Sequence, residues 1–524
     1  MSTASPASSR STGSQEARSA HYERLVAHIA DASLLGSTAS ILGWDQETMM
    51  PDGGLEHRSR QLAQLARMSH EMATDPRVGE WLGACEADRS LMADPLSAEA
   101  VNVREIRRAY DRATKLPASL VEELAKASSI GQHEWAEARK ASDFARFRPH
   151  LARIVDLLRQ KAKCFGWGPG GEAWDALADD YEAGCTAASV TAVFTPLRER
   201  LTKLVHAILD AQSKGRTPPE AFNDFAVPIE VQEAFARHVT AQLGFDYGRG
   251  RLDRSTHPFC GGSHCNDVRM TSRYNERVLL DGLGSAMHET GHGIYEQGLR
   301  ADQIGLPMGE SVSLGIHESQ SRMWENQVGR GRAFWTWAMK ELPRFAGDGV
   351  RRFSLDDFYG AANVVEPGFI RVDADEATYN LHIMIRFEIE RAVLRGDLEV
   401  GGIPEVWNKA YKDYLGLTVP DDRRGCLQDI HWSMAAMGYF PTYTLGNLFA
   451  AQFFEAAREQ LPGLEDGFTR GEFAPLKRWL NTKIHEQGKR FHSGDLCVQV
   501  TGKPLSAEPL MRHLEGKLKP LYGL

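Results

Sequence analysis

Apolar residues recur at helical spacing along most of the chain. The segments HYERLVAHIADASLL (21–35) and LHIMIRFEIERAVLRGDL (381–398) show this clearly, and the second ends near Gly396, a residue type that commonly terminates helices. Start signals precede two further helices, one beginning near Pro117 and one capped by Ser142 or Asp143. The pattern therefore predicts a mainly α-helical protein.

One stretch departs from the helical pattern. Residues 245–275 are rich in Gly, Asp, Ser and Asn, and short runs such as DVRMTSRY (267–274) favour strands. The chain has no internal repeat, no long low-complexity linker after residue 20, and none of the strand–helix–strand alternation of a doubly wound fold. We expect a Ser-rich disordered tail over residues 1–20, then a single large unit over 21–524 with a small β-sheet.

Composition argues against several classes of protein. The net charge of −9 and the pI near 6.1 argue against a nucleic-acid surface, which is normally basic. Seven cysteines are few for 524 residues and odd in number, which argues against a disulfide framework and favours a reducing compartment. We therefore expect a cytoplasmic protein that has no nucleic-acid partner.

Two segments bear on targeting and on membranes. The first 19 residues lack the apolar stretch of a secretory signal, and their two arginines resemble a mitochondrial presequence less than a disordered tail. Residues 432–454 carry no charge, but Gly438 and Pro441 interrupt them, so buried protein interior is favoured over a membrane span. We expect no membrane partner.

The strongest chemical signal is the stretch SAMHETGHGIYEQG (285–298), which has HExxH spacing. Residues four apart on a helix project about 40° apart, so His288 and His292 can bind one metal ion from the same side. Glu289 lies on the adjoining face, where it can reach a water molecule rather than the metal itself. The stretch therefore predicts a metal-binding helix.

A catalytic metal site needs a third protein ligand. Glu318 lies in IHESQSRMWENQ (316–327), which has helical character and would face the metal from a second helix. Glu310 is the competing candidate, but it lies in the Gly- and Pro-containing stretch GLPMGES (305–311), where its direction would be less fixed. In thermolysin-like sites an Asp four residues after the glutamate ligand often orients a histidine, but position 322 is Arg, so such a partner must come from elsewhere.

These residue types predict metal-assisted hydrolysis. The metal polarises the scissile carbonyl, and Glu289 removes a proton from water and passes it to the leaving amine. A further cationic or hydrogen-bonding group must stabilise the oxyanion.

A second cluster of metal-binding residue types is FCGGSHC (259–265). It contains Cys260, His264 and Cys265, but their spacing fits no common zinc motif and no second ligand pair follows. A Gly-rich turn that carries two thiols is therefore favoured over a metal site.

Beyond these residues, the chain resembles the carboxypeptidase Taq family of zinc metallocarboxypeptidases along nearly its whole length after the tail. An N-terminal motif is followed by six others in order. The motifs are GWDQETMMP (43–51), His257-Pro258-Phe259 for HPF, Asp267 to Thr271 for DxRxT, His288 to His292 for HExxH, His317 to Gln320 for the glutamate-ligand segment, Ile370 to Asp375 for IRxxAD, and Gly425 to Trp432 for GxxQDxHW.

The resemblance implies a mostly helical fold, similar to those of neurolysin and angiotensin-converting enzyme, with zinc at the floor of a deep groove. Zinc is the implied cofactor, and cobalt often substitutes for it. Members of the family are typically homodimers. They remove single C-terminal residues from peptides with a free C-terminus, with broad specificity and usually sparing proline.

The matched motifs also supply candidates for substrate binding and catalysis. Arg371 is the first choice for binding the terminal carboxylate, because arginine offers a two-pronged donor; the alternative is an ion pair with Asp373 or Asp375. Arg269 is the second choice, although Asp267 could hold it as a structural pair. His257 is a candidate for the groove rim or a structural residue of a turn.

The segment 425–443 supplies a donor for the reacting carbonyl. His431 is a candidate to donate to the substrate carbonyl or carboxylate, and Tyr439 to stabilise the oxyanion, the alternative for both being an ordinary core position. Gln428 and Asp429 are candidates to support a metal-binding histidine.

Two other functions compete with the carboxypeptidase. An oligopeptidase or dipeptidyl carboxypeptidase on the same scaffold would use the same metal chemistry. A helical binding protein with an incidental HExxH is the non-enzyme alternative, which the intact set of motifs disfavours.

Overall fold

A computed structural model describes residues 20–219, 222 and 225–524. Helices dominate these residues, and three short strands form their sheet, which confirms the predicted mainly α fold with a small sheet. The predicted tail lies outside the described residues, except for Ala20, which begins the first helix. The prediction that 21–524 is one unit stays a prediction.

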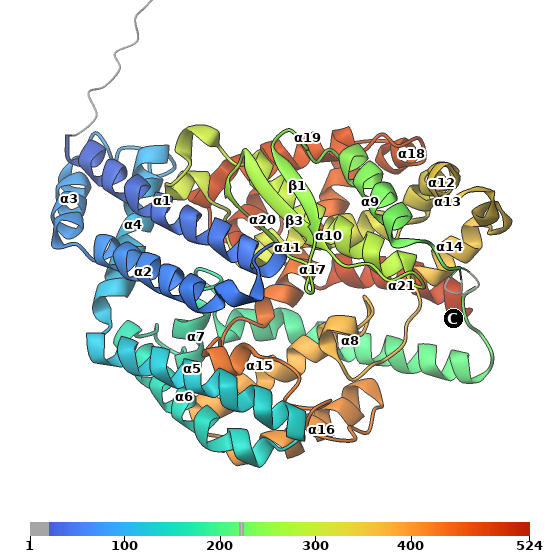
Figure 1. Cartoon of the computed structure of the whole chain (residues 1–524), viewed down its shortest axis with the longest axis horizontal. Helices are drawn as coiled ribbons and strands as arrows, with labels where there is room; N and C mark the ends of the chain where they lie inside the picture. The colour runs from blue at the N-terminus through green and yellow to red at the C-terminus, as the bar shows by residue number, and fades with distance from the viewer. Residues whose placement is uncertain (1–19, 220–221, 223–224) are drawn as a thin grey trace, which may run out of the picture.

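The helices fall into two halves, one above the other in Figure 1. The lower half contains α5 (Ala118–Ala141), α6 (Phe144–Phe165), α7 (Ala173–Ala178), α8 (Ala187–Ser213), α15 (Tyr379–Arg395) and α16 (Ile403–Leu415). The upper half contains α1 (Ala20–Thr48), α2 (Leu55–Ala73), α3 (Pro76–Ala87), α4 (Ala98–Lys115), α9 (Ile229–Leu243), α10 (Leu279–Gly298), α11 (Leu314–Arg322), α12 (Arg332–Glu341), α13 (Pro343–Ala346), α14 (Leu355–Ala361), α17 (Pro441–Gln460), α18 (Leu464–Phe468), α19 (Ala474–Lys483), α20 (Ser493–Thr501) and α21 (Glu508–Tyr522).

The predicted helix ends agree with the structure. Pro117 directly precedes α5, and the Asp143 side chain accepts a hydrogen bond from the Arg146 amide at the start of α6. Gly396 ends α15 with a φ of 87°, a left-handed conformation that glycine adopts without steric cost. Local sequence therefore determines where these helices begin and end.

The sheet lies against α10. Its strands β1 (Gly250–Arg254), β2 (Cys260–His264) and β3 (Asp267–Ser272) have the order β1-β3-β2, with β1 parallel and β2 antiparallel to β3. A Cβ on Gly293 of α10 would lie 2.8 Å from the Phe245 ring and 2.9 Å from the Met270 sulfur. Because real Cβ contacts are longer, only glycine lets α10 approach the sheet this closely.

Two apolar segments bear on the membrane question. Most of residues 432–454 are buried, as predicted, and α17 carries many of them. In the described part of the chain, α1 is the one helix long and apolar enough to cross a membrane, and 6% of its apolar window is buried. One such helix near the N-terminus is weak evidence for a membrane segment.

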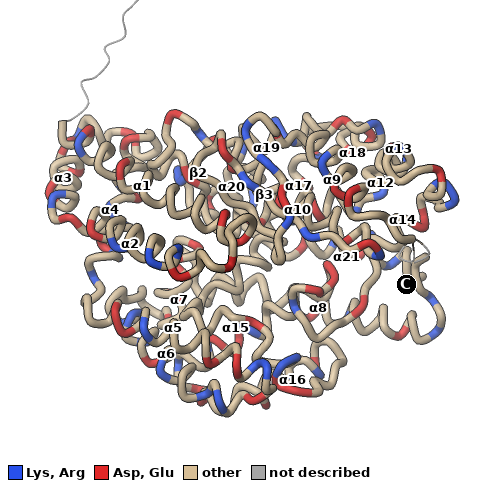
Figure 2. The backbone as a smooth tube through the Cα atoms, viewed as in Figure 1, with Lys and Arg blue, Asp and Glu red and all other residues tan. Residues whose placement is uncertain are grey.

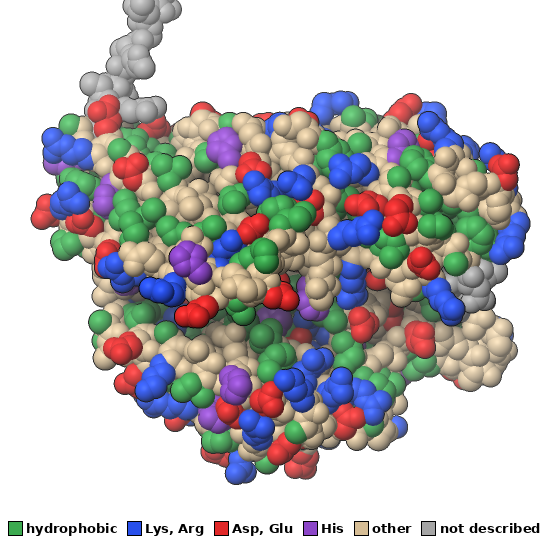
Figure 3. Space-filling model, viewed as in Figure 1, with side chains coloured by type: hydrophobic (Ala, Val, Ile, Leu, Met, Phe, Trp, Pro, Cys, Tyr) green, Lys and Arg blue, Asp and Glu red, His purple; other side chains and the backbone are tan. Residues whose placement is uncertain are grey.

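The surface is hollowed between the two halves. Figure 3 shows this groove across the middle of the molecule, bordered by histidine and acidic side chains. Figure 2 shows basic and acidic residues interspersed along the chain in the same view. The groove, rather than a uniformly charged face, is therefore the main feature of this side.

Helices α1, α3 and α4 share a small apolar core of their own, centred on Leu25, Leu82 and Val103. Asn102, fully buried, links this core to the rest of the molecule. Its Oδ1 accepts from the Met308 amide at 2.9 Å, and its Nδ2 donates to the Tyr22 hydroxyl at 3.1 Å. Asn102 thus contributes a buried hydrogen bond between α4 and the segment that carries Met308.

Replacing Asn102 with Ala is expected to lower the free energy of unfolding by about 1–3 kcal/mol, because the buried Met308 amide loses its acceptor. Differential scanning calorimetry should show a lower Tm. Asn408→Ala, which changes an exposed residue of α16, is the matched control and should leave Tm unchanged. An unchanged Tm in Asn102→Ala would contradict the linking role.

Candidate metal centre and active site

Three side chains converge between α10 and α11. The Nε2 atoms of His288 and His292 lie 3.6 and 3.5 Å from Oε2 of Glu318. Ligand atoms of the three residues all lie within 4.8 Å of one another. In the described part of the chain, no other three His, Cys, Asp or Glu residues bring their ligand atoms this close together. The structure thus brings together the three residues predicted as ligands; Glu310 instead pairs with Lys489.

Two glycines allow the helices to meet at this point. A Cβ on Gly291 would lie 2.4 Å from the Gln320 carbonyl oxygen, so any side chain there would push α10 and α11 apart. A Cβ on Gly446 of α17 would lie 2.5 Å from Cγ of Glu318. Glu318 is therefore confined between α10 and α17.

The start of α11 is held by two hydrogen bonds. The Ser313 hydroxyl accepts from the Ile316 amide, and Oε2 of buried Glu182 accepts from the Gly315 amide at 2.8 Å. Glu182 lies just before α8, so the lower half of the molecule fixes the helix that carries Glu318.

Arg322 orients Glu318. Its Nε donates to Oε1 of Glu318 at 2.7 Å, which leaves Oε2 facing the two histidines. Burial alone would raise the pKa of Glu318, but Arg322 and His288 outweigh it and hold the pKa well below its usual range. The carboxylate is therefore ionised, as a metal ligand must be.

Each histidine has a partner on its other ring nitrogen. His288 Nδ1 lies 2.9 Å from Oε2 of Glu325, and His292 Nδ1 lies 2.6 Å from Nδ1 of His317. His317 continues through Nε2 to Glu296 at 2.7 Å. When Nε2 faces a metal, Nδ1 carries the proton and donates it to these partners, which fixes the ring orientation.

These partners were missed in the sequence, although both lie in the predicted ligand segment. His317 directly precedes Glu318, and Glu325 follows it by seven residues, or about two helical turns. Residues Met323–Gly329 form a π-helical stretch, which shifts Glu325 from its ideal α-helical position. The repeat of acidic residues at Glu318 and Glu325 was the available signal.

The electrostatic setting suits metal binding at His292 and proton transfer at Glu289. Burial and the neighbouring His317 lower the pKa of His292 to about 3, so its ring is neutral. Burial raises the pKa of Glu289, a residue only 5% exposed, to about 7. A carboxyl with a pKa near neutrality can both accept and return a proton.

The donor set fits a catalytic metal site. Two imidazoles and one carboxylate are a common ligand set for catalytic zinc, and Arg322 occupies the carboxylate oxygen that faces away from the histidines. The site can therefore hold a divalent metal with one position left for substrate or water.

A cluster of Tyr379, Tyr439, Tyr443 and His431 lies beside Glu318. Glu318 contributes to a raised pKa at all three tyrosines, after burial, which places their hydroxyls within its field. The Tyr443 hydroxyl lies 3.4 Å from His431 Nε2, and the Tyr439 and Tyr443 rings are 5.4 Å apart. The structure thus brings His431 and Tyr439 next to the candidate metal centre, together with Tyr443, which the sequence did not single out.

Arg371 borders this cluster. It is 5% exposed, and its Nη2 lies 2.9 Å from Asp429 while its Nη1 donates to the Tyr379 hydroxyl at 3.0 Å. Asp375 instead caps the start of α15 through the Ala377 and Thr378 amides. The predicted alternative partners, Asp373 and Asp375, are therefore replaced by Asp429.

Gln428 and Asp429 hold arginines rather than a metal-binding histidine. Oε1 of Gln428 accepts from the Arg371 amide and from Arg386, each at 2.8 Å. Asp429 bridges the two guanidinium groups, with Arg386 2.6 Å away. The expectation that this pair supports His288 or His292 is thus corrected.

Comparison with known proteins agrees with this geometry. The family described as carboxypeptidase Taq (M32) metallopeptidase matches residues 24–518. Thermostable carboxypeptidase 1 of Thermus thermophilus is 45% identical over 515 residues, 96% of this chain and 99% of that protein. Carboxypeptidase 1 of Bacillus subtilis is 36% identical over 486 residues, 93% and 95% of the two chains. The crystal structure of the M32 carboxypeptidase from Deinococcus radiodurans R1 has a TM-score of 0.92 and 38% identity, covering 97% of this chain and 100% of that one.

The chain belongs to the carboxypeptidase Taq metallopeptidase family. The match spans every element that builds the candidate metal centre, from the sheet to α17. The chain is therefore a metallocarboxypeptidase.

Arg269 and His257, the other two candidates for substrate binding in this metallocarboxypeptidase, lie on β3 and in the turn between β1 and β2. Arg269 forms a two-pronged ion pair with Asp267 at 2.9 and 3.1 Å, and its guanidinium stacks 4.6 Å from the Trp44 ring. Arg251 stacks on the same ring at 4.9 Å. His257 is exposed in the turn between β1 and β2. These contacts give Arg269 a structural role, and the substrate-binding roles of Arg269 and His257 stay predictions.

The cysteine cluster forms part of the sheet. Cys260 and His264 are the ends of β2, and Cys265 Sγ lies 3.7 Å from the His264 ring. All seven cysteines are free thiols. Among the described residues, the ligand atoms of this cluster do not lie close enough together to hold one metal ion. Residues 260–264 therefore form a strand rather than the predicted Gly-rich turn, because they pair with β3, and the absence of a metal there stays a prediction.

Replacing Glu325 with Gln is expected to weaken metal affinity by about 10–100-fold, because His288 loses its charged acceptor. Competition with a chromogenic chelator, with zinc as the probe metal, measures this change. Glu459→Gln, at an exposed position of α17, is the matched control and should bind as the wild type does. Equal affinity in both variants would contradict the orienting role of Glu325.

Proposed function

We propose that this metallocarboxypeptidase holds zinc through His288, His292 and Glu318 and releases single C-terminal residues from peptides. The observation that carries the proposal is the convergence of both histidine Nε2 atoms on Oε2 of Glu318, about 3.5 Å away. Bound zinc would supply Lewis acidity toward the scissile carbonyl and lower the pKa of water.

Glu289 is the proposed general base. Its buried carboxyl, with a pKa of about 7, takes a proton from the attacking water and returns it to the leaving amine. Tyr439 and His431, in the aromatic cluster beside Glu318, are the proposed donors to the carbonyl oxygen as negative charge develops.

Arg371 is the proposed partner of the terminal carboxylate. Asp429 and Tyr379 fix its guanidinium while leaving N–H groups unused, because arginine has five N–H donors. The terminal carboxylate would accept hydrogen bonds from these N–H groups and from the tyrosine hydroxyls of the neighbouring cluster. Arg269 is the second choice for binding that carboxylate, and His257 is proposed for the groove rim, both supported by their matched motifs.

The finer properties implied by the family resemblance are proposed with this function. They comprise broad specificity, activity with cobalt in place of zinc, a homodimer in the cytoplasm with neither membrane nor nucleic-acid partners, and a fold related to neurolysin and angiotensin-converting enzyme. The relatives named carboxypeptidases support the exopeptidase over an oligopeptidase or dipeptidyl carboxypeptidase.

An N-blocked dipeptide is expected to be cleaved when its C-terminus is a free acid but not when it is the amide, because only the acid pairs with Arg371. Release of the C-terminal residue by each substrate is followed by chromatography. Equal cleavage of both forms, or release of a dipeptide from an N-blocked tripeptide, would contradict the carboxypeptidase assignment in favour of the oligopeptidase or dipeptidyl alternative.

Glu289→Gln is expected to lower kcat by several orders of magnitude while retaining about one metal ion per chain, because Glu289 is a base and not a ligand. Steady-state kinetics and elemental analysis measure the two quantities. Glu405→Gln, at an exposed position of α16, is the control and should keep full activity. Near wild-type turnover in Glu289→Gln would show that another group accepts the proton.

A further inference from the structure

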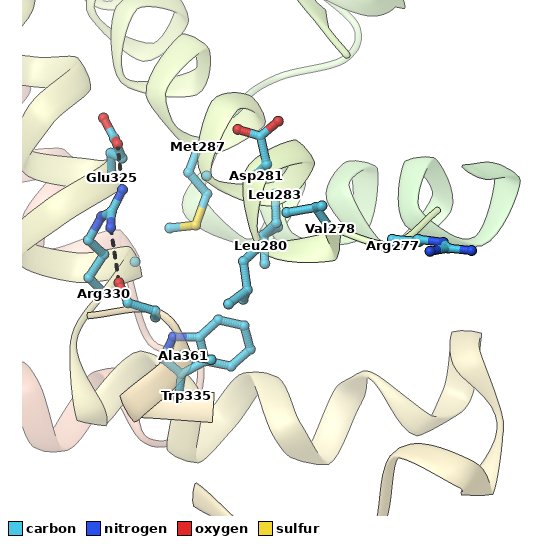
Figure 4. Close-up of a pocket in the computed structure, with 13 residues that line it drawn as sticks. Arg277, Val278, Leu280, Asp281, Leu283, Met287, Glu325, Arg330, Trp335 and Ala361 are labelled. Atoms are coloured by element: carbon cyan, nitrogen blue, oxygen red, sulfur yellow. Dashed lines mark hydrogen bonds and ion pairs between the residues drawn. The ribbon is translucent and has the colours of Figure 1, made fainter. Parts of the chain in front are cut away.

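A cavity of about 420 Å³ lies beside the first turns of α10, facing α12 and α14 (Figure 4). Most of its wall is apolar. Its apolar residues include Leu280, Leu283, Met287, Trp335, Ala361 and Ala362. Trp335 presents a large flat ring opposite Leu280, and it is held from behind by stacking on Phe358 at 5.1 Å.

The cavity adjoins the candidate metal centre. Glu325, which binds His288 Nδ1, also lines the cavity, where it pairs with Arg330. Asp281 and Gly284 precede His288 by seven and four residues, so they lie on the same face of α10 as the two histidines. The cavity therefore continues the metal-binding face of α10 toward the start of the helix.

The cavity lies on the side of the site that holds Arg371. Arg273 reaches Asp281 at the cavity rim, 3.7 Å away, and also Asp373, 4.0 Å away. Asp373 ends the short turn that Arg371 begins. The short turn that carries Arg371 is therefore linked to the cavity rim through Asp373 and Arg273.

We propose that this cavity binds the side chain of the C-terminal residue that is released and favours large apolar or aromatic residues. The proposal rests on the proposed function and adds a substrate preference to it. The wall removes apolar surface of the ligand from water, and the charges of Glu325 and Arg330 compensate each other. Of the other charged lining residues, Asp281 lies 3.7 Å from Arg273, and Arg277 points away from Trp335 in Figure 4.

Gly284 is the specificity-determining position. A Cβ built on it would meet no atom within 4 Å, so its missing side chain leaves the cavity open along α10. A bulkier residue would extend into this space and compete with the substrate side chain. Small C-terminal residues do not need that space.

The test compares kcat/KM for two N-blocked dipeptides that differ only in their last residue, Phe or Ala. The wild type should favour Phe by at least about tenfold, and Gly284→Val should reduce this ratio by about tenfold. The matched control is Gly516→Val, because Gly516 also lies inside a helix with no atom within 4 Å of its Cβ position. The control should keep the wild-type ratio.

Ala361→Leu fills the same cavity from α14 and should lower the Phe-to-Ala ratio in the same direction. Metal content and Tm establish that both variants remain folded and loaded. Unchanged ratios in the two variants, or an equal loss on both substrates, would overturn the assignment of the cavity. Failure of the wild type to release either residue would instead contradict the proposed function.

Discussion

The candidate active site depends on the close approach of α10 and α11 at Gly291. The backbone of Gln320 and Ser321 occupies the space in which a side chain of residue 291 would lie, with Cα of Ser321 only 2.5 Å from the built Cβ. This contact places Glu318 opposite the two histidines of α10. Gly293 on the sheet side and Gly446 on α17 allow similar approaches, so three glycines set the distances among four elements.

Such tight packing forces several charges into the interior. Glu289, Glu318 and Glu325 are all nearly buried, and unpaired carboxylates there would be costly. Arg322 compensates two of them, because it bonds Oε1 of Glu318 and lies 3.2 Å from Glu325. Among the described residues no arginine or lysine pairs with Glu289, and burial raises its pKa to about 7. The same packing therefore yields one ionised ligand and one carboxyl able to exchange a proton.

Local signals in the sequence predicted much of this arrangement. Helix ends at Pro117, Asp143 and Gly396 follow from residues next to them in the chain, and the HExxH spacing follows from helix geometry alone. The order of the strands in the sheet could not be predicted. β1 pairs with β3 and not with β2, which follows β1 in the sequence, and this pairing depends on tertiary contacts.

The partners of the charged residues also escaped prediction. Asp429 lies 58 residues from Arg371 in the chain, and nothing in either motif shows that they pair. Glu325 lies in the segment predicted to carry the third ligand. However, no simple sequence signal predicts the π-helical stretch that places its carboxylate next to His288. Spacing reveals ligands on one helix, whereas partners on different elements follow from tertiary packing.

Tyr379 connects the metal centre to the residues proposed to recognise the peptide end. Its ring lies 4.4 Å from the guanidinium of Arg322, which orients Glu318, and its hydroxyl accepts from Arg371. Asp429 anchors Arg371 from the other side and is itself held by Arg386 of α15, the helix that Tyr379 begins. Tyr379, the first residue of α15, thus contacts both Arg322 and Arg371. In the proposed function, the start of α15 therefore connects the arginine that orients Glu318 with the arginine proposed to bind the terminal carboxylate.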